Sequence, residues 1–348
     1  MKINFILPGI GQSGGIRMAF MYANALVEKG HDVVCYYPLT GIYVGWKKIL
    51  FPKAIIRQIR DANSNASWIS KKFIVKAPMI INNATVRDAD VTIATYWLTA
   101  YWVNKLSDSK GKKIYFVQDY EVWGDKLSRR MAKLSYELKM NKIITVSHAL
   151  SEILKENFNV NSEIICNGIP RAEIGTPEKV YKKICISMPY RDGERKNIDL
   201  GLKVIKKFKN SGNEIKVFGF EKPENWSDDI EFLENPNRKQ LQEFYKTTDI
   251  LYVPSLYEGW GLPAVEAMAH GCVVLAHNSG AIAEFGRDQE NCVVLQNPKD
   301  PLEAERKISE LIVNVEKRRK IGRAAWETIV QGYTFEAASK KFEEVLKG

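Results

Sequence analysis

Residues 252–271 read YVPSLYEGWGLPAVEAMAHG, and this stretch decides the fold of the second half of the chain. It begins as a buried strand, turns at Gly259 and Gly261, and continues as a helix from about Pro263, because proline suits the first turn of a helix. Free backbone N–H groups at such a helix start bind anions, and the two glycines let a phosphate approach closely. The stretch therefore predicts a phosphate site between a strand and a helix.

Two carboxylates flank this predicted phosphate site. Glu258 lies at the mouth of the turn and Glu266 lies one turn inside the helix. Both would repel a phosphate, so they are better suited to accept hydrogen bonds from sugar or ribose hydroxyls. The alternative is that both are solvated surface residues, which an isolated pair at this spacing would favour. The flanking prolines and glycines favour a ligand.

Short apolar runs alternate with helical patterns along the rest of the chain, which is typical of mostly parallel sheets. The predicted strands are Ile3–Leu7, Asp32–Tyr37, Val91–Thr95, Lys113–Val117, Lys142–Val146, Ile184–Ser187, Glu214–Phe218, Ile250–Val253, Val273–Ala276 and Val293–Leu295. The predicted helices are Ile16–Lys29, Ser128–Lys139, His148–Asn157, Ile198–Asn210, Lys239–Thr247 and Pro301–Lys347, the last one interrupted near residues 331–333.

The segment Asn167-Gly168-Ile169-Pro170 breaks the alternation and marks a domain boundary. We predict an α/β protein of two Rossmann-like domains facing each other across a cleft, the first spanning residues 1–168 and the second beginning at residue 169. Crevices at the carboxyl ends of parallel strands bind ligands in such folds, so the cleft is the predicted ligand site.

The positive charge is concentrated in the first half of the chain. The chain has 348 residues, 45% of them hydrophobic and 26% charged, which is typical of a soluble globular protein. Residues 1–168 contain 23 Lys and Arg against 13 Asp and Glu, whereas residues 169–348 contain 28 of each. Such a basic half predicts an anionic partner, such as a phospholipid surface, a phosphorylated lipid or nucleic acid.

Within the basic half, residues 43–76 contain eight Lys and Arg against the single acid Asp61, with aromatic and aliphatic residues between them. This segment suits either an interface with anionic membrane lipids or a basic surface helix over the first sheet. Nucleic acid is not expected as the partner, because no recognised binding module accompanies the charge.

Other features point to a cytoplasmic protein. The first residues predict no secretory signal, and the most apolar stretch, Val91–Asn104, has 14 residues, whereas a membrane span needs roughly 20. The five cysteines form no Cys-x-x-Cys pair, so we expect buried thiols and no zinc site.

Two further loops carry candidate site residues. Arg191 and Lys196 follow the first strand of the second half, where two cations can neutralise phosphate charge and stabilise a leaving nucleoside diphosphate. Gly14 and Gly15 lie between the first strand and the first helix. They lack the Gly-x-Gly-x-x-Gly spacing of a dinucleotide site, which argues against a dehydrogenase.

Together these motifs resemble the family of retaining, nucleotide-sugar-dependent glycosyltransferases with the GT-B fold, and the likeness spans nearly the whole chain. Glu258 and Glu266 resemble the family's Glu-x7-Glu signature, which implies that Glu258 contacts the donor sugar and Glu266 the nucleotide ribose. The amides of Gly259, Trp260, Gly261 and Leu262 would then face the diphosphate. The resemblance also implies that Arg191 and Lys196 grip the diphosphate and that the loop of Gly14 and Gly15 approaches the reaction centre.

Later segments agree with this family. Asn278-Ser279-Gly280 followed by Glu284 resembles a family stretch, although a structural helix start explains it equally well. Residues 332–336 resemble the closing element, which implies that the second domain ends near residue 334 and that a final helix of residues 335–348 returns to the first domain.

The strand Lys113–Val117 leads into a departure from the family. Gln118 and Asp119 follow it, where many relatives carry a histidine followed by Asp near the donor sugar. Gln118 can hydrogen-bond a hydroxyl in a sugar or acceptor pocket but cannot take a proton at neutral pH, so the role of the histidine is absent or falls to Asp119. The sequence around Gln118 resembles a subgroup that includes polysaccharide rhamnosyltransferases.

No metal is expected, because Arg191, Lys196 and the helix start supply positive charge. Asp88-Ala89-Asp90 matches the metal-binding Asp-x-Asp of another transferase fold, but it precedes a buried strand and is better explained as a turn or strand start.

The expected function is transfer of a sugar, with retention, from a UDP, dTDP or GDP sugar to a hydroxyl of a glycan or lipid-linked acceptor in polysaccharide or glycoconjugate synthesis. We expect no cofactor, and a cytoplasmic enzyme, peripheral on the inner membrane face if residues 43–76 bind lipid. Two alternatives remain: a nucleotide-sugar epimerase of the same fold, and a non-catalytic basic membrane-binding protein.

Overall fold

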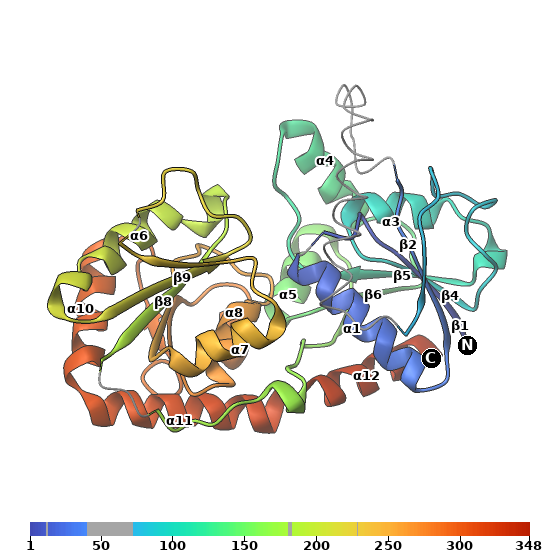
Figure 1. The fold of residues 1–348 in the computed structure, drawn as a ribbon. Coiled ribbons are helices and arrows are strands. Elements are labelled where there is room, and N and C mark those ends of the chain that lie inside the picture. The colour runs from blue at the N-terminus through green and yellow to red at the C-terminus, as the bar shows by residue number, and fades with distance from the viewer. Residues whose placement is uncertain (12, 40–71, 180–182, 228) are drawn as a thin grey trace. The chain divides into compact units, whose positions relative to one another are not determined.

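The computed structural model describes residues 1–11, 13–39, 72–179, 183–227 and 229–348. It divides into two compact units, Met1–Cys166 with Ser339–Gly348, and Asn167–Ala338 (Figure 1). Each unit contains one open sheet in which every described strand pair is parallel, with helices against the sheet. The predicted class, α/β with two Rossmann-like domains, is confirmed.

The sheet of the first unit has the strand order β3-β2-β1-β4-β5-β6-β7. The strands are β1 Lys2–Ile6, β2 Asp32–Tyr36, β3 Ile74–Lys76, β4 Val91–Ala94, β5 Lys112–Val117, β6 Lys142–Thr145 and β7 Glu163–Ile164. All four residues of β4 are buried, because β4 lies in the middle of the sheet with both faces covered. The continuous apolar pattern of such strands made them readable from the sequence.

Helices complete the first unit. They are α1 Gly14–Glu28, α3 Trp97–Asn104, α4 Lys126–Ser135 and α5 His148–Phe158, together with most of α12 Phe335–Lys347. Phe342 of α12 stacks on Tyr22 of α1, with ring centroids 4.3 Å apart, and meets Phe116 of β5 edge-on at 5.3 Å. The last helix is therefore part of the core of the first unit.

The sheet of the second unit has the strand order β10-β9-β8-β11-β12-β13. The strands are β8 Cys185–Tyr190, β9 Glu214–Gly219, β10 Glu231–Glu234, β11 Ile250–Val253, β12 Val273–His277 and β13 Val293–Leu295. The helices are α6 Ile198–Lys206, α7 Arg238–Thr247, α8 Leu262–Met268, α9 Ile282–Phe285, α10 Pro301–Val313 and α11 Val315–Gly332.

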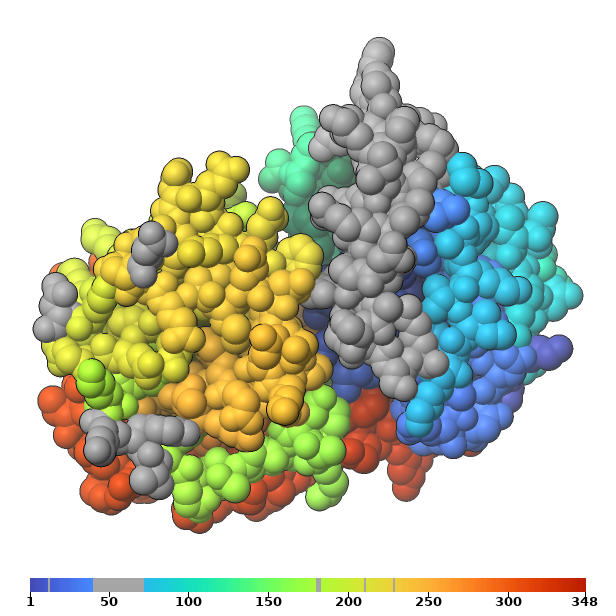
Figure 2. All heavy atoms as spheres, in the orientation of Figure 1, coloured from blue at the N-terminus to red at the C-terminus, as the bar shows by residue number. Residues whose placement is uncertain are grey.

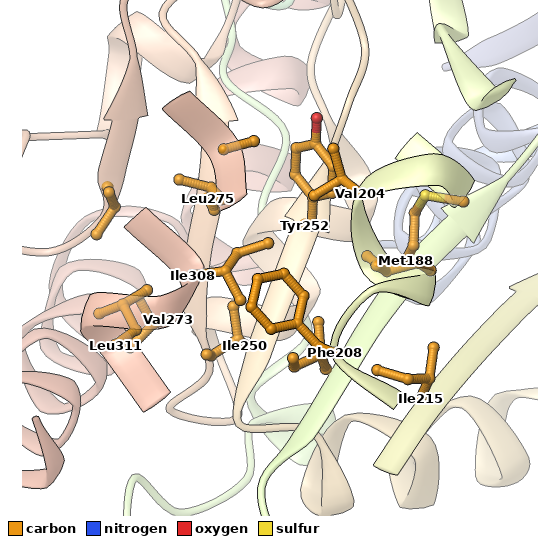
Figure 3. Packing of buried hydrophobic residues seen from close by; sticks show 14 of the residues in the cluster. Met188, Val204, Phe208, Ile215, Ile250, Tyr252, Val273, Leu275, Ile308 and Leu311 are labelled. Carbon is orange, nitrogen blue, oxygen red and sulfur yellow. The ribbon is translucent and has the colours of Figure 1, made fainter. Parts of the chain in front are cut away.

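One face of this second sheet is buried under α6 and α10. Figure 3 shows Ile250, Val273 and Leu275 of the central strands against Val204 of α6 and Ile308 of α10. On the surface of the unit, α7 is part of the face seen in Figure 2, with Lys239 and Glu243 exposed. The helix buries Leu241, Phe244 and Tyr245 on its other side.

Strand order explains where the predicted site residues lie within each unit. In the second unit β8, β11 and β12 are neighbours, so the loops after them start at the same edge of the sheet. In the first unit β1 and β5 both neighbour β4, so Gly15 and Gln118 also follow strands at one edge. Carboxyl ends of parallel strands are where such folds bind ligands.

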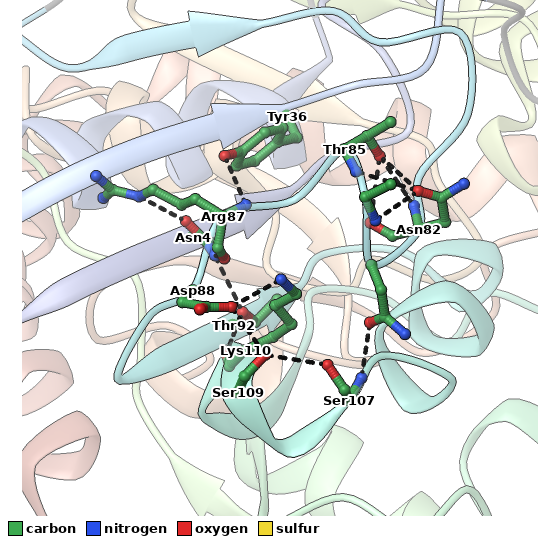
Figure 4. A network of polar contacts seen from close by, with 12 residues as sticks. Asn4, Tyr36, Asn82, Thr85, Arg87, Asp88, Thr92, Ser107, Ser109 and Lys110 are labelled. Atoms are coloured by element: carbon green, nitrogen blue, oxygen red, sulfur yellow. Dashed lines mark hydrogen bonds and ion pairs between the residues drawn. The ribbon is translucent and has the colours of Figure 1, made fainter.

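Asp88 and Asp90 lie at the opposite, amino-terminal edge of the first sheet, just before β4. Asp88 accepts hydrogen bonds from Lys110 Nζ and Ser109 Oγ, both at 2.8 Å, within the polar network drawn in Figure 4. Asp90 accepts one from the backbone N–H of Lys2 at 2.7 Å. These contacts confirm the interpretation of this segment as a strand start.

The structure adds elements that the sequence pattern did not predict. The strands β3, β7 and β10 have two to four residues at sheet edges, too short for a visible alternation. The apolar stretch Val91–Asn104 is two elements, β4 and α3. A further break falls at Asn314, whose side chain accepts from the backbone N–H of Lys317 and caps α11.

Two earlier predictions concern membranes. Residues 43–71 of the predicted basic stretch lie outside the described residues. Among its described residues, Lys72 forms an ion pair with Glu28 at 2.7 Å and Ile74–Lys76 forms β3. Among the helices that the structure describes, none has both the length and the apolar character needed to cross a bilayer.

The cysteines carry no disulfide. Cys35, Cys185, Cys272 and Cys292 are buried, as expected, whereas Cys166 is partly exposed. Burial raises the pKa of the Cys185 and Cys292 thiols to about 12, so these two side chains are protonated, unreactive core residues.

Candidate functional site

The loop after β8 brings two cationic side chains to the predicted site of the second unit. Residues Glu194–Lys196 form a single 3₁₀ turn, closed by a hydrogen bond from Lys196 N–H to Gly193 O at 2.8 Å. The N–H of Leu256 bonds Arg195 O at 2.8 Å, so this loop is fastened to the loop after β11. The two loops that carry the sequence motifs therefore lie side by side.

Lys196 and Glu258 form an ion pair across these loops. The distance from Lys196 Nζ to Glu258 Oε1 is 2.6 Å, and the side chains are 20% and 14% exposed. Charge-assisted contacts of this length are strong when partly screened from water. Two residues that the sequence singled out separately, 62 positions apart, thus meet at one point.

The two arginines of the loop after β8, Arg191 and Arg195, differ in their surroundings. The Arg195 guanidinium lies 5.7 Å from the centre of the Tyr257 ring, a cation–π contact. Arg191 is exposed and makes no hydrogen bond or ion pair with the part of the chain that the structure describes. It is therefore available to an anionic ligand.

The backbone of Glu258 is held from the loop after β12. The N–H of Ala281 donates to Glu258 O at 3.0 Å. Gly280 has a φ of +57°, and a Cβ there would lie 1.9 Å from Glu258 O, so no other residue fits without moving the loop. Gly280 and Ala281 thus hold the main chain of Glu258 in place.

The turn before α8 is formed as the sequence predicts. Gly261 caps the helix with a φ of +77°, and Pro263 lies in the first turn. The Trp260 side chain is buried against Phe285 and Tyr333, with ring centroids 5.7 Å away in each case. Its indole N–H has no acceptor among the described residues.

Glu266 is buried, with its carboxylate bonded inside the second unit. Its Oε1 accepts from Arg238 Nη1 at 2.8 Å and its Oε2 accepts from Tyr245 OH at 3.0 Å, both donors coming from α7. Arg238 also pairs with both carboxylate oxygens of Glu173. The helix that carries Glu266 is thereby tied to α7 and to the turn of Arg171–Glu173.

This cluster changes the ionisation of its members. Burial alone would lower the pKa of Arg238, but the carboxylates of Glu266 and Glu173 outweigh it and raise that pKa, so the guanidinium stays charged. Burial, and then the charge of Glu266, raise the pKa of Tyr245 well above its usual value, so its hydroxyl stays protonated and donates.

Sequence reasoning missed Arg238, Tyr245 and Glu173. No spacing rule links Arg238 to a glutamate 28 residues later, but the fold does. The connections β10-α7-β11 and β11-α8-β12 run the same way across the sheet, and right-handed crossovers then place both helices on one face. Asn237, which caps α7, was the local signal that Arg238 begins a helix.

In the first unit the structure brings Gly15 and Gln118 together. Gln118 Nε2 donates to Gly15 O at 3.0 Å, which fixes the amide plane of Gln118 against the start of α1. Gln118 Oε1 is buried and has no donor among the described residues. The side chain therefore offers one acceptor without a partner. Asp119 follows it in the same loop.

A buried carboxyl group lies two residues further on. Glu121 Oε2 accepts from the N–H of Trp97 at 2.6 Å and from Tyr115 OH at 3.1 Å. Burial, and then the charge of Asp119, raise the pKa of Glu121 well above its usual value. The group joins the loop after β5 to the first turn of α3.

Comparison with known proteins finds a family match within the second unit. Residues 173–328, which contain Arg191, Lys196, Glu258 and Glu266, match the family "Glycosyl transferases group 1". This match covers less than half of the chain. Relatives and solved structures are similar to this chain beyond residues 173–328 as well.

One relative is a lipopolysaccharide 1,2-N-acetylglucosaminetransferase of Salmonella typhimurium, 23% identical over 297 residues, or 84% of this chain and 70% of the relative. Two solved structures share the fold of the whole chain at 14% identity. Sucrose-phosphate synthase of Thermosynechococcus elongatus has a TM-score of 0.76 and covers 100% of this chain and 98% of its own. HepE of Anabaena, solved with UDP-glucose, has a TM-score of 0.75, and the match covers 100% of this chain and 99% of HepE. The chain as a whole thus shares its two-unit fold with these solved structures.

Proposed function

We propose that the protein is a retaining glycosyltransferase that moves a sugar from a nucleoside diphosphate sugar to a hydroxyl of a glycan or lipid-linked acceptor. The observation that carries the proposal is the 2.6 Å contact between Lys196 Nζ and Glu258 Oε1 within the residues that match the group 1 family. It joins a candidate phosphate-binding cation to a candidate sugar-binding carboxylate, the two functions that such a donor requires.

The relatives support the choice of donor and acceptor class. The solved HepE structure holds UDP-glucose, and the Salmonella relative is named for transfer to lipopolysaccharide. We therefore propose a UDP, dTDP or GDP sugar as donor and a role in cell-surface polysaccharide or glycoconjugate synthesis on the cytoplasmic side of the membrane. The ten excess positive charges in residues 1–168 suit an anionic acceptor or membrane surface.

In this proposal Arg191 and Lys196 hold the diphosphate, together with the backbone N–H groups of Gly259 to Leu262. Negative charge grows on the leaving phosphate as the bond from the sugar carbon to the phosphate oxygen breaks. Fixed positive groups at that point stabilise the transition state more than the ground state. In this proposal the Lys196 ammonium contacts both Glu258 and the phosphate, which links sugar binding to phosphate binding.

Retention follows from attack on the face that the phosphate leaves. The acceptor oxygen bonds the sugar carbon, and the departing phosphate oxygen takes the acceptor proton. In the first unit, the amides of Gly14 and Gly15 approach the donor, while Gln118 Oε1 accepts a hydrogen bond from a sugar or acceptor hydroxyl and Asp119 lies beside it. No proton needs to pass through Gln118, in keeping with an amide that does not titrate.

The test is nucleotide release from a panel of donor sugars by the wild type and by Lys196→Ala, Glu258→Ala and Arg191→Ala. Loss of one phosphate contact should lower turnover by roughly 10²–10³-fold, as for other oxyanion donors. The matched control is Lys207→Ala, because Lys207 pairs with Glu305 at 2.7 Å elsewhere in the second unit. Full activity of both Lys196→Ala and Glu258→Ala would refute the assigned roles.

Product analysis separates this proposal from its main alternative. A nucleotide-sugar epimerase would convert the donor in the absence of any acceptor, whereas a transferase needs one. The anomeric configuration of the product, measured by NMR, tests retention directly. An inverted product would leave the transferase assignment but exclude same-face attack.

A further inference from the structure

The guanidinium of Arg238 donates hydrogen bonds to two carboxylates, those of Glu173 and Glu266. Its Nε and Nη2 face both oxygens of Glu173, and its Nη1 lies 2.8 Å from Glu266 Oε1. The bidentate contact holds the planar guanidinium in one orientation, which also fixes the directions of the two N–H bonds of Nη1. One of these two N–H bonds is directed at Glu266.

A second donor fixes the other oxygen of the same carboxylate. Tyr245 OH lies 3.0 Å from Glu266 Oε2, and the Glu266 side chain is only 5% exposed. One donor on each oxygen sets both the position and the plane of the carboxylate. With a donor on each oxygen, the Glu266 side chain acts as an acceptor of hydrogen bonds.

We infer that Arg238 is a positioning residue which, with Tyr245, holds Glu266 as a fixed acceptor for the two neighbouring hydroxyls of a ribose, so that the site selects ribonucleoside diphosphate sugars over 2′-deoxyribonucleoside ones. The inference rests on the proposed function, because the contact between Glu266 and a ribose is part of it. It narrows the donor class to UDP or GDP sugars and excludes dTDP sugars.

The physical basis is the number of donors that each nucleotide offers. A ribose presents two neighbouring hydroxyls to an acceptor, whereas a 2′-deoxyribose presents one. Hydrogen bonds to charged groups contribute enough that losing one weakens binding by roughly 10- to 100-fold. A carboxylate fixed in position and plane is preorganised to accept from both hydroxyls, whereas a mobile one gains less from the second hydroxyl because it must be ordered to make both hydrogen bonds.

Lysine could not replace Arg238 in this role. A lysine would preserve the charge beside Glu266. Its ammonium lacks the planar geometry that lets arginine bind Glu173 with two N–H groups while a third N–H donates to Glu266. Arg238→Lys therefore separates orientation from charge, and Arg238→Gln removes both.

The experiment measures, by calorimetry on the full chain, the affinities for UDP and 2′-deoxy-UDP and for GDP and 2′-deoxy-GDP. For the base that binds, we expect the wild type to favour the ribonucleotide by roughly 10- to 100-fold. Arg238→Gln and Arg238→Lys should reduce that ratio to below about threefold, and Tyr245→Phe should give an intermediate ratio. Glu173→Gln, which weakens the fork without touching Glu266, should also lower it.

Arg318→Gln is the matched control. Arg318 is another partly buried arginine of the second unit, paired with Asp249 at 3.7 Å and not in contact with Glu266. Its removal should leave the ribose selectivity unchanged even if it lowers the melting temperature. Since Arg238→Gln risks unfolding, Arg238→Lys and Glu173→Gln keep the inference testable.

Equal wild-type affinity for the two sugars of the nucleotide would overturn the inference. So would unchanged selectivity in both folded Arg238 variants; if Glu266→Gln then abolishes the selectivity, the ribose contact of Glu266 stands and only the role of Arg238 fails. If Glu266→Gln keeps the selectivity, the ribose assignment fails as well, while donor turnover in the Lys196 and Glu258 variants still tests the transferase proposal separately.

Discussion

Glu258 and Glu266 meet their cations in two different ways, and the difference matches their proposed roles. Glu258 pairs with the ammonium of Lys196. This ammonium is a compact charge on a flexible side chain, so it can also contact an incoming phosphate. Glu266 pairs with the guanidinium of Arg238, which is fixed by Glu173. The first pair can rearrange when the donor binds, and the second holds its geometry.

Gly280→Ala tests whether the main chain of Glu258 matters to the site. A methyl group at Gly280 would lie 1.9 Å from Glu258 O and would occupy a backbone conformation that L-residues avoid. The loop must shift, which moves Glu258 away from Lys196. We expect a loss of turnover of about 10²-fold, since displacements near 1 Å at a reacting centre have effects of that size.

The control is Gly332→Ala, because a Cβ at Gly332 meets nothing within 4 Å. It should keep full turnover of the donor. Wild-type turnover in Gly280→Ala, with donor affinity unchanged, would show that the position of the Glu258 loop does not limit the reaction.

Glu121→Gln tests the buried carboxyl group of the first unit. Burial raises the pKa of Glu121 above its usual value of 4.5, so the folded state keeps a proton that the unfolded chain loses as the pH rises above that value. The contribution of Glu121 to the free energy of unfolding is therefore largest below about pH 4.5 and falls as pH rises toward the folded pKa, by at most about 1.4 kcal/mol per pH unit.

Glutamine cannot ionise, yet it preserves an acceptor oxygen for the Trp97 N–H and Tyr115 OH. The free energy of unfolding of Glu121→Gln, measured by urea titration from pH 4 to pH 8, should exceed that of the wild type increasingly as pH rises. Parallel pH curves for the two proteins would mean that Glu121 is not the titrating group.

At the scale of elements, the sequence predicts what local patterns encode. Central strands such as β4 and β11 are wholly buried and read as continuous apolar runs. The short edge strand β10 has no fully buried residue and gives no such signal. The helix α3 was missed because it follows β4 after only two residues, in one apolar stretch.

The residues of the candidate site likewise fall into those that local sequence patterns predict and those that they do not. Glu258, Lys196 and the turn at Gly261 were predictable, because a motif carries each of them. The partners of Glu266 were not, because Arg238 and Tyr245 reach it through helix packing that depends on strand order. The contact between Gln118 and Gly15 likewise joins residues 103 positions apart.

The helix α12 offers a test of which forces hold an element in place. Phe342 is fully buried against Tyr22, Phe5 and Phe116, and its truncation to alanine should cost about 3–5 kcal/mol. Glu343, the next residue, contacts Lys29 at 3.0 Å, His31 at 2.9 Å and Lys347 at 2.6 Å. Its replacement by glutamine should cost only about 0.2–1 kcal/mol, the usual range for ion pairs near the surface.

Urea unfolding of Phe342→Ala and Glu343→Gln, compared with limited proteolysis near the carboxyl terminus, measures both effects. We expect Phe342→Ala to be cleaved faster within α12 and Glu343→Gln to resemble the wild type. A larger loss in Glu343→Gln would mean that charge, and not apolar packing, anchors the helix.

At the scale of the whole molecule, charge and candidate chemistry are distributed unevenly between the two units. Residues 1–168 hold the entire excess of ten positive charges, whereas residues 169–348 are neutral in total. Yet the candidate phosphate contacts, Arg191 and Lys196, lie in the second unit, Asn167–Ala338, which has no net positive charge. In the proposed function, the excess positive charge of residues 1–168 is therefore available to an anionic acceptor or a membrane surface.

This distribution predicts where a nucleoside diphosphate protects the chain. At 100 times its Kd, the ligand adds about 2.7 kcal/mol to the stability of the state that binds it. Hydrogen exchange with saturating UDP or GDP should therefore slow in residues 191–197 and 256–266 of the second unit. It should stay unchanged in β1 to β4 of the first unit, and Lys196→Ala should weaken the protection at equal ligand concentration. Protection confined to the first unit would place the diphosphate among the basic residues there and would remove Lys196 and Glu258 from the donor site.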